Sequence, residues 1–167
     1  MVLETSRDLF VHELKQMYYV ENRLVDVLDE LAVETPDEKL AEGFSSHRDE
    51  TRQQVERLER VFRELGETPE EAESGVLDGL LRDREEFERE VGSDDLKTPF
   101  NLTAGIKTER VEITAYQSLI TLANEIEFEG DVKGPLEANL DEEKDTLRSL
   151  ETMQKGSNVK KIVQNLL

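Results

Sequence analysis

The stretch Lys107-Thr-Glu109-Arg-Val-Glu112-Ile-Thr-Ala-Tyr116 shows most clearly how this 167-residue chain folds. Glu109 and Glu112 are three residues apart, so a helix places both carboxylates on one face. That face also carries the residues that we expect to point at the core: Leu102, Ile106, Ile113, Tyr116, Ile120 and Ala123. Two carboxylates inside an apolar stripe are costly to bury unless a positive charge is buried with them. The pattern therefore indicates a polar site inside a helical core.

The composition excludes several classes of protein. The net charge is −19 and there is no cysteine. Phosphate binding needs clustered Lys and Arg, so nucleic acid is not an expected partner. Without cysteine there is no disulfide framework and no thiolate metal site, which favours the reducing cytoplasm and leaves carboxylate and imidazole as metal ligands. A strongly acidic surface over a regular core predicts adaptation to high salt, where counterions screen the self-repulsion.

The length and the N-terminus give further expectations. A chain of this size predicts one domain over residues 1–167. No apolar run is long enough to span a bilayer. The start, MVLETSRDLFVHELK, lacks the basic beginning and small-residue cleavage site of a signal peptide. We therefore expect no membrane association.

Apolar periodicity predicts four long helices. The first runs from Ser6 to Val33 with Thr5 or Ser6 as its cap, and Glu21 fills the one gap in its stripe. The second starts at the capping box Thr35-Pro-Asp-Glu38 and ends at Gly66. Its seam is apolar at both ends and polar in the middle: Leu40, Phe44, His47, Thr51, Gln54, Leu58, Val61 and Leu65. Glu50 lies at the edge of that polar section.

The remaining segments complete an all-α prediction. A second capping box, Thr68-Pro-Glu-Glu71, predicts a crossover helix over residues 70–91 that packs outside the bundle. The third long helix follows Thr98-Pro99 and ends near Phe128. The fourth opens at Gly134-Pro135, and its apolar stripe is interrupted by Glu143. The tail, about residues 156–167, is basic and amphipathic, and we expect it to dock on the bundle or on a second subunit. The fold expected is all-α, with four long helices and one crossover helix between the second and third of them.

Five glutamates fall near the midpoints of the long helices, which should pack at similar depth. They are Glu21, Glu50, Glu109, Glu112 and Glu143. Unpaired carboxylates meeting in a dry core would repel one another and take up protons, and divalent cations remove that cost. Oxygen ligands with an imidazole suit iron or manganese, and bridging carboxylates suit two ions.

Each of these residues also has a simpler interpretation. A solvated or salt-bridged position is the ordinary role of any single glutamate in so acidic a chain. His47 has three candidate roles: a metal ligand, a group that orients Glu50, or a buried histidine bonded to Ser46 or Thr51. Tyr116 suits the core, with its hydroxyl available to a carboxylate. The main alternative to metal is buried Arg–Glu pairing, in which Arg110 neutralises a neighbouring glutamate.

Four motifs in this order resemble the YciF-type, stress-associated branch of the ferritin-like superfamily. They are Tyr19-Val-Glu21 with Leu24, Phe44-Ser-Ser-His47-Arg-Asp-Glu50-Thr51 with Val55-Glu-Arg-Leu58, Glu109-Arg-Val-Glu112-Ile113 with Tyr116, and Leu140-Asp-Glu-Glu143-Lys144. The resemblance implies a bundle that is often dimeric and carries a rubrerythrin-like di-iron site. It implicates the same five glutamates, with His47 at or beside the metals. This chain departs from the family in having Arg110 where histidine is usual and Leu147 where aspartate is common.

The leading functional hypothesis is therefore a cytoplasmic di-metal carboxylate protein, expected to form a homodimer, that oxidises ferrous iron with dioxygen or peroxide. Its cofactor would be a di-iron centre, with manganese as the other candidate metal, and the redox chemistry needs no separate acid or base. The alternative is a metal-free scaffold or stress-associated binding protein that kept the bundle and lost the site. That alternative predicts Arg110 pointing inward onto Glu109, Glu112 or Glu143. An iron-storage cage is a third, weaker hypothesis, because nothing in the sequence encodes shell contacts.

Overall fold

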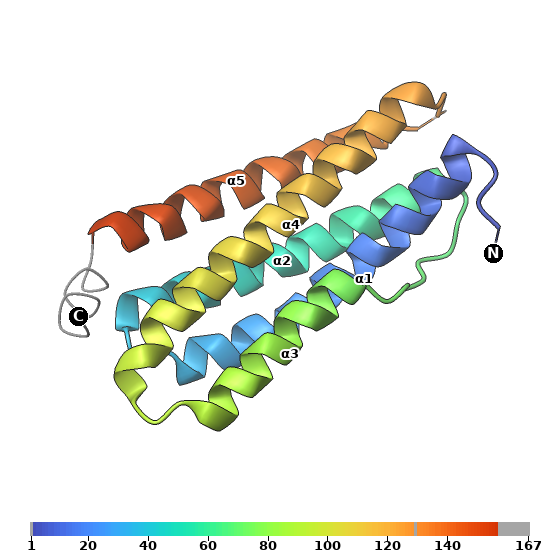
Figure 1. The fold of residues 1–167 in the computed structure, drawn as a ribbon. Coiled ribbons are helices and arrows are strands. Elements are labelled where there is room, and N and C mark those ends of the chain that lie inside the picture. Colours follow the sequence, from blue (N-terminus) through green and yellow to red (C-terminus); the bar gives the residue numbers. More distant parts are fainter. Residues whose placement is uncertain (1, 129, 157–167) are drawn as a thin grey trace.

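Four long helices form the bundle in the computed structural model, which describes residues 2–128 and 130–156 (Figure 1). They are α1 (Ser6–Glu34), α2 (Glu38–Glu64), α4 (Lys97–Glu125) and α5 (Lys133–Gly156). The shorter α3 (Gly75–Glu90) and the 3₁₀ turn η1 (Asp94–Leu96) connect α2 to α4. Because α3 carries the chain back along the bundle, α2 and α4 run in the same direction, and α1 and α5 run opposite to them. This is the ferritin-like arrangement predicted from the sequence.

Local signals explain where the helices begin and end. Thr5 caps α1 in a capping box with Asp8. Gly66 has a φ of 70°, and this left-handed residue lets the Gly66 and Glu67 amides bond to the carbonyls of Arg63 and Phe62 at the end of α2. The described part of the chain contains no helix with the length and apolarity needed to cross a bilayer.

Two predicted capping boxes are wrong. The cap of α2 is Asp37, whose side chain accepts from the Leu40 amide at 2.9 Å. Thr35 does not cap the helix because it is buried and its hydroxyl accepts from Asn101 of α4. Sequence alone could not supply that distant partner.

The crossover helix also starts later than predicted. It begins at Gly75 behind the cap Ser74, and residues 67–74 are not helical. The Ala72 amide donates to the Lys15 carbonyl at 3.2 Å, and Gln16 Nε2 donates to the Glu73 carbonyl at 3.1 Å. Because α1 binds this backbone, residues 67–74 do not form the predicted start of the helix. The other helix ends lie within three residues of prediction. The tail beyond residue 156 lies outside the described residues.

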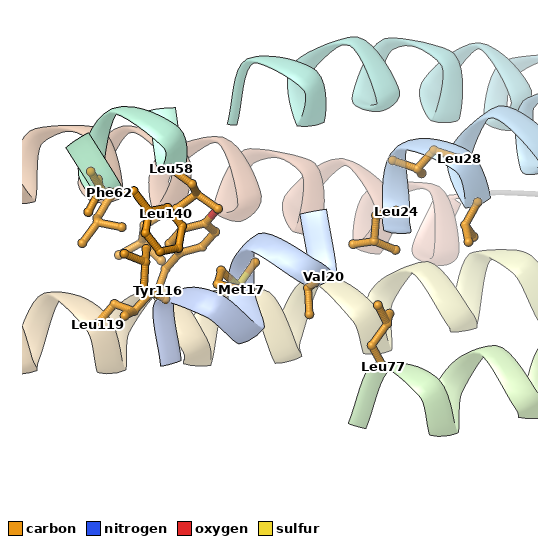
Figure 2. Packing of buried hydrophobic residues seen from close by; sticks show 14 of the residues in the cluster. Met17, Val20, Leu24, Leu28, Leu58, Phe62, Leu77, Tyr116, Leu119 and Leu140 are labelled. Atoms are coloured by element: carbon orange, nitrogen blue, oxygen red, sulfur yellow. The ribbon is translucent and has the colours of Figure 1, made fainter. Parts of the chain in front are cut away.

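The core follows the predicted seams with one shift on α4. All eight seam residues predicted for the second helix are buried. On α4 the buried positions include Leu102, Tyr116, Leu119 and Ala123, whereas Ile106, Ile113 and Ile120 are only partly buried against the core. Gly105 lies on this seam, and a Cβ there would come within 3.1 Å of a Leu150 methyl, so its missing side chain allows α5 to approach. Figure 2 shows part of the resulting apolar packing.

Candidate metal centre

The polar section of each seam lies at mid-bundle. Glu21 comes from α1, His47 from α2, Glu109 and Glu112 from α4, and Glu143 from α5. None of the five residues is more than 5% exposed. The helices that bury the apolar residues therefore carry four carboxylates and an imidazole into the same interior.

Four of these side chains meet closely. His47 Nε2 lies 3.2 Å from Glu109 Oε1 and 4.0 Å from Glu143 Oε2. Together with Glu112, they offer one ligand atom each within 4.8 Å of one another. Three carboxylate oxygens and an imidazole nitrogen are a ligand set that suits iron or manganese.

The ligand atoms at the centre lack protein partners. Among the described residues, the buried Oε2 atoms of Glu21, Glu109, Glu112 and Glu143 accept no hydrogen bond, and His47 Nδ1 has no partner either. Buried polar atoms are normally paired, and each exception needs an explanation. No Lys or Arg among the described ion pairs contacts these four carboxylates. Bound cations fit this arrangement because they would satisfy the oxygens and balance their charge.

The charges of the cluster shift the pKa values of its members. Burial raises the pKa of Glu21 to about 8. Burial, reinforced by neighbouring carboxylates, raises the pKa values of Glu112 and Glu143 well above their ordinary range. Burial alone would lower the pKa of His47, but Glu109 and its other carboxylate neighbours raise it well above the ordinary value. Without cations, the cluster therefore retains protons at neutral pH.

Glu21 lies beside this group of four residues, and a hydrogen bond from α4 fixes its position. Its Oε1 accepts a hydrogen bond from the Tyr116 hydroxyl, which itself accepts from Asn139 Nδ2 at 2.8 Å. Tyr116 is fully buried, as the sequence predicted. Only one oxygen of Glu21 is engaged by this bond, and the other is the unpartnered Oε2.

Glu50 differs from the other predicted ligands. Its side chain is 46% exposed, and its Oε2 lies 3.8 Å from His47 Nδ1. It is outside the close group of four. The neighbouring His47 imidazole lowers the pKa of Glu50. Its carboxylate therefore lies at the edge of the centre and not inside it.

Arg110 points away from the site. Its side chain is 62% exposed and pairs with Glu151 at 2.6 Å. The inward Arg110 expected for a metal-free scaffold is therefore wrong, as is the pairing of Arg110 with a buried glutamate. Leu147, the second departure from the family pattern, is partly exposed on α5.

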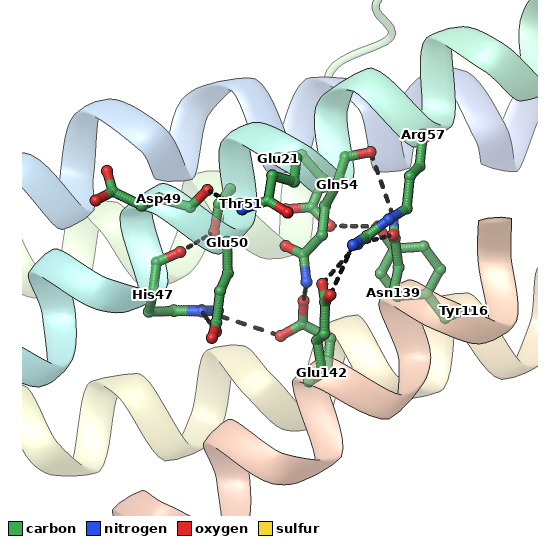
Figure 3. A network of polar contacts seen from close by, with 12 residues as sticks. Glu21, His47, Asp49, Glu50, Thr51, Gln54, Arg57, Tyr116, Asn139 and Glu142 are labelled. Atoms are coloured by element: carbon green, nitrogen blue, oxygen red, sulfur yellow. Dashed lines mark hydrogen bonds and ion pairs between the residues drawn. The ribbon is translucent and has the colours of Figure 1, made fainter.

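Sequence reasoning missed a polar network that supports the cluster. Gln54 Nε2 donates to Glu143 Oε1 at 2.5 Å. Arg57 donates to both oxygens of Glu142 at 2.6 and 2.7 Å and to Asn139 Oδ1 at 2.9 Å, as Figure 3 shows. Gln54 and Asn139 are fully buried. Their only sequence signal is a polar residue at a buried helical position.

The fold and the buried cluster define a ferritin-like helical bundle with a candidate carboxylate metal centre. The family described as "Domain of unknown function (DUF892)" matches residues 5–163, so the chain belongs to that family.

Individual relatives agree with this assignment. The chain is 31% identical to Protein YciF of Escherichia coli (strain K12) over 147 residues, which cover 87% of this chain and 88% of YciF. The crystal structure of the E. coli stress protein YciF superposes with a TM-score of 0.87 and 29% identity, covering 95% of this chain and 99% of that one. The protein YcfI of Rhodopseudomonas palustris gives a TM-score of 0.85 at 31% identity, covering 89% and 94%.

Proposed function

We propose that this protein binds two divalent metal ions in the mid-bundle cluster and oxidises ferrous iron with dioxygen or peroxide, as part of stress protection. Support comes chiefly from the buried carboxylate oxygens that accept no hydrogen bond among the described residues. Their number exceeds what the single imidazole of His47 can neutralise. The E. coli relative YciF is a stress protein, which supports the biological setting.

The ligands divide into a central set and an extension. His47, Glu109, Glu112 and Glu143 offer atoms close enough to share one ion. Glu21 adds a fifth buried group with one free oxygen, which extends the set toward a second ion. Iron and manganese both suit these ligands, and iron is the metal that we propose.

The chain orients these ligands through neighbouring side chains. Gln54 holds one oxygen of Glu143, and Tyr116 holds one oxygen of Glu21, so in each case the second oxygen remains free for metal. The buried apolar residues around the cluster exclude water. Iron held by these residues would supply the redox chemistry. Two ferrous ions would give up one electron each, and these electrons with two protons would reduce hydrogen peroxide to two waters or dioxygen to hydrogen peroxide.

The test begins with the metal content of the purified protein, followed by ferrous oxidation under each oxidant. We expect close to two ions per chain and a lag-free oxidation rate above the uncatalysed background. Glu112→Ala should lose the bound ions and the oxidation above background. Glu125→Ala is the matched control, since Glu125 is exposed on the same helix. Oxidation rates that are equal in wild type and Glu112→Ala would contradict the proposed activity.

A further inference from the structure

A cleft of about 310 Å³ opens between α2 and α5 and leads to the candidate metal centre. We call it the α2–α5 cleft. Its walls include Ser46 and Glu50 of α2 and Asp145 and Ser149 of α5. His47 and Glu109 also line it, so the cleft connects the surface with two members of the buried cluster.

The inner end of the cleft presents unsatisfied polar atoms. His47 Nδ1 and Glu109 Oε2 are buried and have no hydrogen-bond partner among the described residues. Both residues are at least 95% buried. Because His47 and Glu109 line the cleft, their unpartnered nitrogen and oxygen are suited to bind a cation that arrives through it.

At the outer end of the cleft, one carboxylate has no Lys or Arg partner in the described part of the chain. Glu142 pairs with Arg57, and Asp145 pairs with Arg148. Glu50 also lines the cleft, but no Lys or Arg among the described ion pairs contacts it. Its only charged neighbour in that set is His47, 3.8 Å away and one helical turn earlier.

A second cavity beside His47 and Glu109 is a poor route for an ion. It has a volume of about 40 Å³ and lies between α1, α2, α3 and α4. Its walls are mostly aliphatic, including Leu24, Leu80 and Leu81. A hydrated cation would lose its water there without gaining ligands.

We propose that the α2–α5 cleft is the route by which divalent cations reach the buried cluster, and that Glu50 captures them at its mouth and passes them to His47 and Glu109. The inference rests on the proposed metal site and deepens it. A negatively charged cleft with low-dielectric walls raises the local cation concentration and the association rate. The long, half-exposed side chain of Glu50 can contact both solvent and the His47 side of the cluster.

Binding kinetics test this role with Co²⁺ alone as the probe. The chain has three tyrosines and no tryptophan, so quenching of tyrosine fluorescence reports Co²⁺ arrival in a stopped-flow experiment. Glu50→Gln removes the charge at nearly constant shape, and Ser149→Phe narrows the cleft. Glu56→Gln makes the same charge change at an exposed position of α2 that does not line the cleft. Equilibrium titration of each variant gives the Kd and the number of ions bound.

We expect Glu50→Gln to lower the association rate constant on the order of tenfold. Dissociation should slow in parallel, because a residue used only during passage changes both rates and leaves Kd and stoichiometry unchanged. Ser149→Phe should slow association and dissociation, and Glu56→Gln should change neither rate.

Unchanged rates in Glu50→Gln and Ser149→Phe, with normal binding by the wild type, would overturn the access route alone. Faster dissociation and a lost ion in Glu50→Gln would make Glu50 a resident ligand and overturn its role in passage. A wild-type protein that binds no Co²⁺, Mn²⁺ or Fe²⁺ would overturn the metal site itself, and the access route with it.

Discussion

Two layers of the same interior are equally buried and differ in chemistry. In the apolar layer, Leu58, Phe62 and Leu119 are fully buried and pack together (Figure 2). In the carboxylate layer, Glu21 and Glu143 are fully buried as well. Burial of a leucine or phenylalanine side chain stabilises the fold by about 1.5–3 kcal/mol. Burial of a carboxylate without a cation has the opposite sign. The apolar layer thus holds the bundle together, and the carboxylate layer is kept at a cost that points to function.

Removal of a large side chain from the apolar layer should have the greatest effect. Phe62→Ala removes a ring that packs edge-on against Tyr18, with centroids 5.5 Å apart. We expect a loss of about 3–5 kcal/mol in the free energy of unfolding, measured by urea denaturation with and without Mn²⁺. The loss should be the same in both conditions, because Phe62 is not a ligand. Val33→Ala, at a position that is 83% exposed, is the control, and a loss in Phe62→Ala as small as in this control would refute the assignment.

Neutralising a glutamate of the carboxylate layer should instead stabilise the metal-free protein. The pKa of Glu112 is raised well above 4.5 in the folded state. Above pH 4.5 the unfolded chain loses this proton while the native state retains it, so the stability of the wild type falls as pH rises toward the folded pKa. Glu112→Gln removes this pH-dependent loss of stability, because glutamine does not titrate.

The advantage of Glu112→Gln over wild type should therefore grow between pH 5 and 8, by up to about 1.4 kcal/mol per pH unit. Urea unfolding at four pH values in the presence of a chelator measures it, with Glu125→Gln as the exposed control. Saturating Mn²⁺ should reverse the order, because a ligand that binds only the native state stabilises it. A constant difference across this pH range would contradict the raised pKa.

The contact between the two layers can be tested at Tyr116. Tyr116→Phe leaves Glu21 Oε1 and Asn139 Nδ2 without their shared partner. We expect a cost of about 1–3 kcal/mol in the free energy of unfolding. In a double-mutant cycle, Glu21→Leu should reduce that cost, because an apolar residue needs no hydrogen bond. Strict additivity of the two substitutions would show that the Tyr116–Glu21 bond contributes nothing.

The smallest effect is expected at Arg110. Because the Arg110 side chain is exposed and, within the described residues, pairs only with Glu151, Arg110→Ala should change the free energy of unfolding by no more than about 0.5 kcal/mol. Mn²⁺ affinity should stay as in wild type, whereas Glu109→Ala at the adjacent position should abolish binding. Isothermal titration of the two variants measures this difference. A large change of affinity in Arg110→Ala would place its charge near the ions after all.

Prediction from sequence was strongest where one helix decides the outcome. The seam of α2 is buried as its 3.6-residue period requires, including the polar His47, Thr51 and Gln54. Prediction was weakest where a residue far away in the sequence binds a segment that carries a local helix-capping motif. Thr68-Pro-Glu-Glu71 is a good capping box, yet α1 binds the backbone of the following residues and the helix starts at Gly75.

By itself, the sequence determined the helical class, the position of the long helices and the polar interruptions of their apolar stripes. Only the tertiary structure decided that Glu109, Glu112 and Glu143 meet at His47, that Glu50 lies half-exposed beside them, and that Arg110 turns to Glu151. It also brought together Gln54, Arg57 and Asn139. The physical reason is that periodicity relates each side chain to the axis of its own helix. The rotation and depth of one helix relative to the next come from the packing of all four.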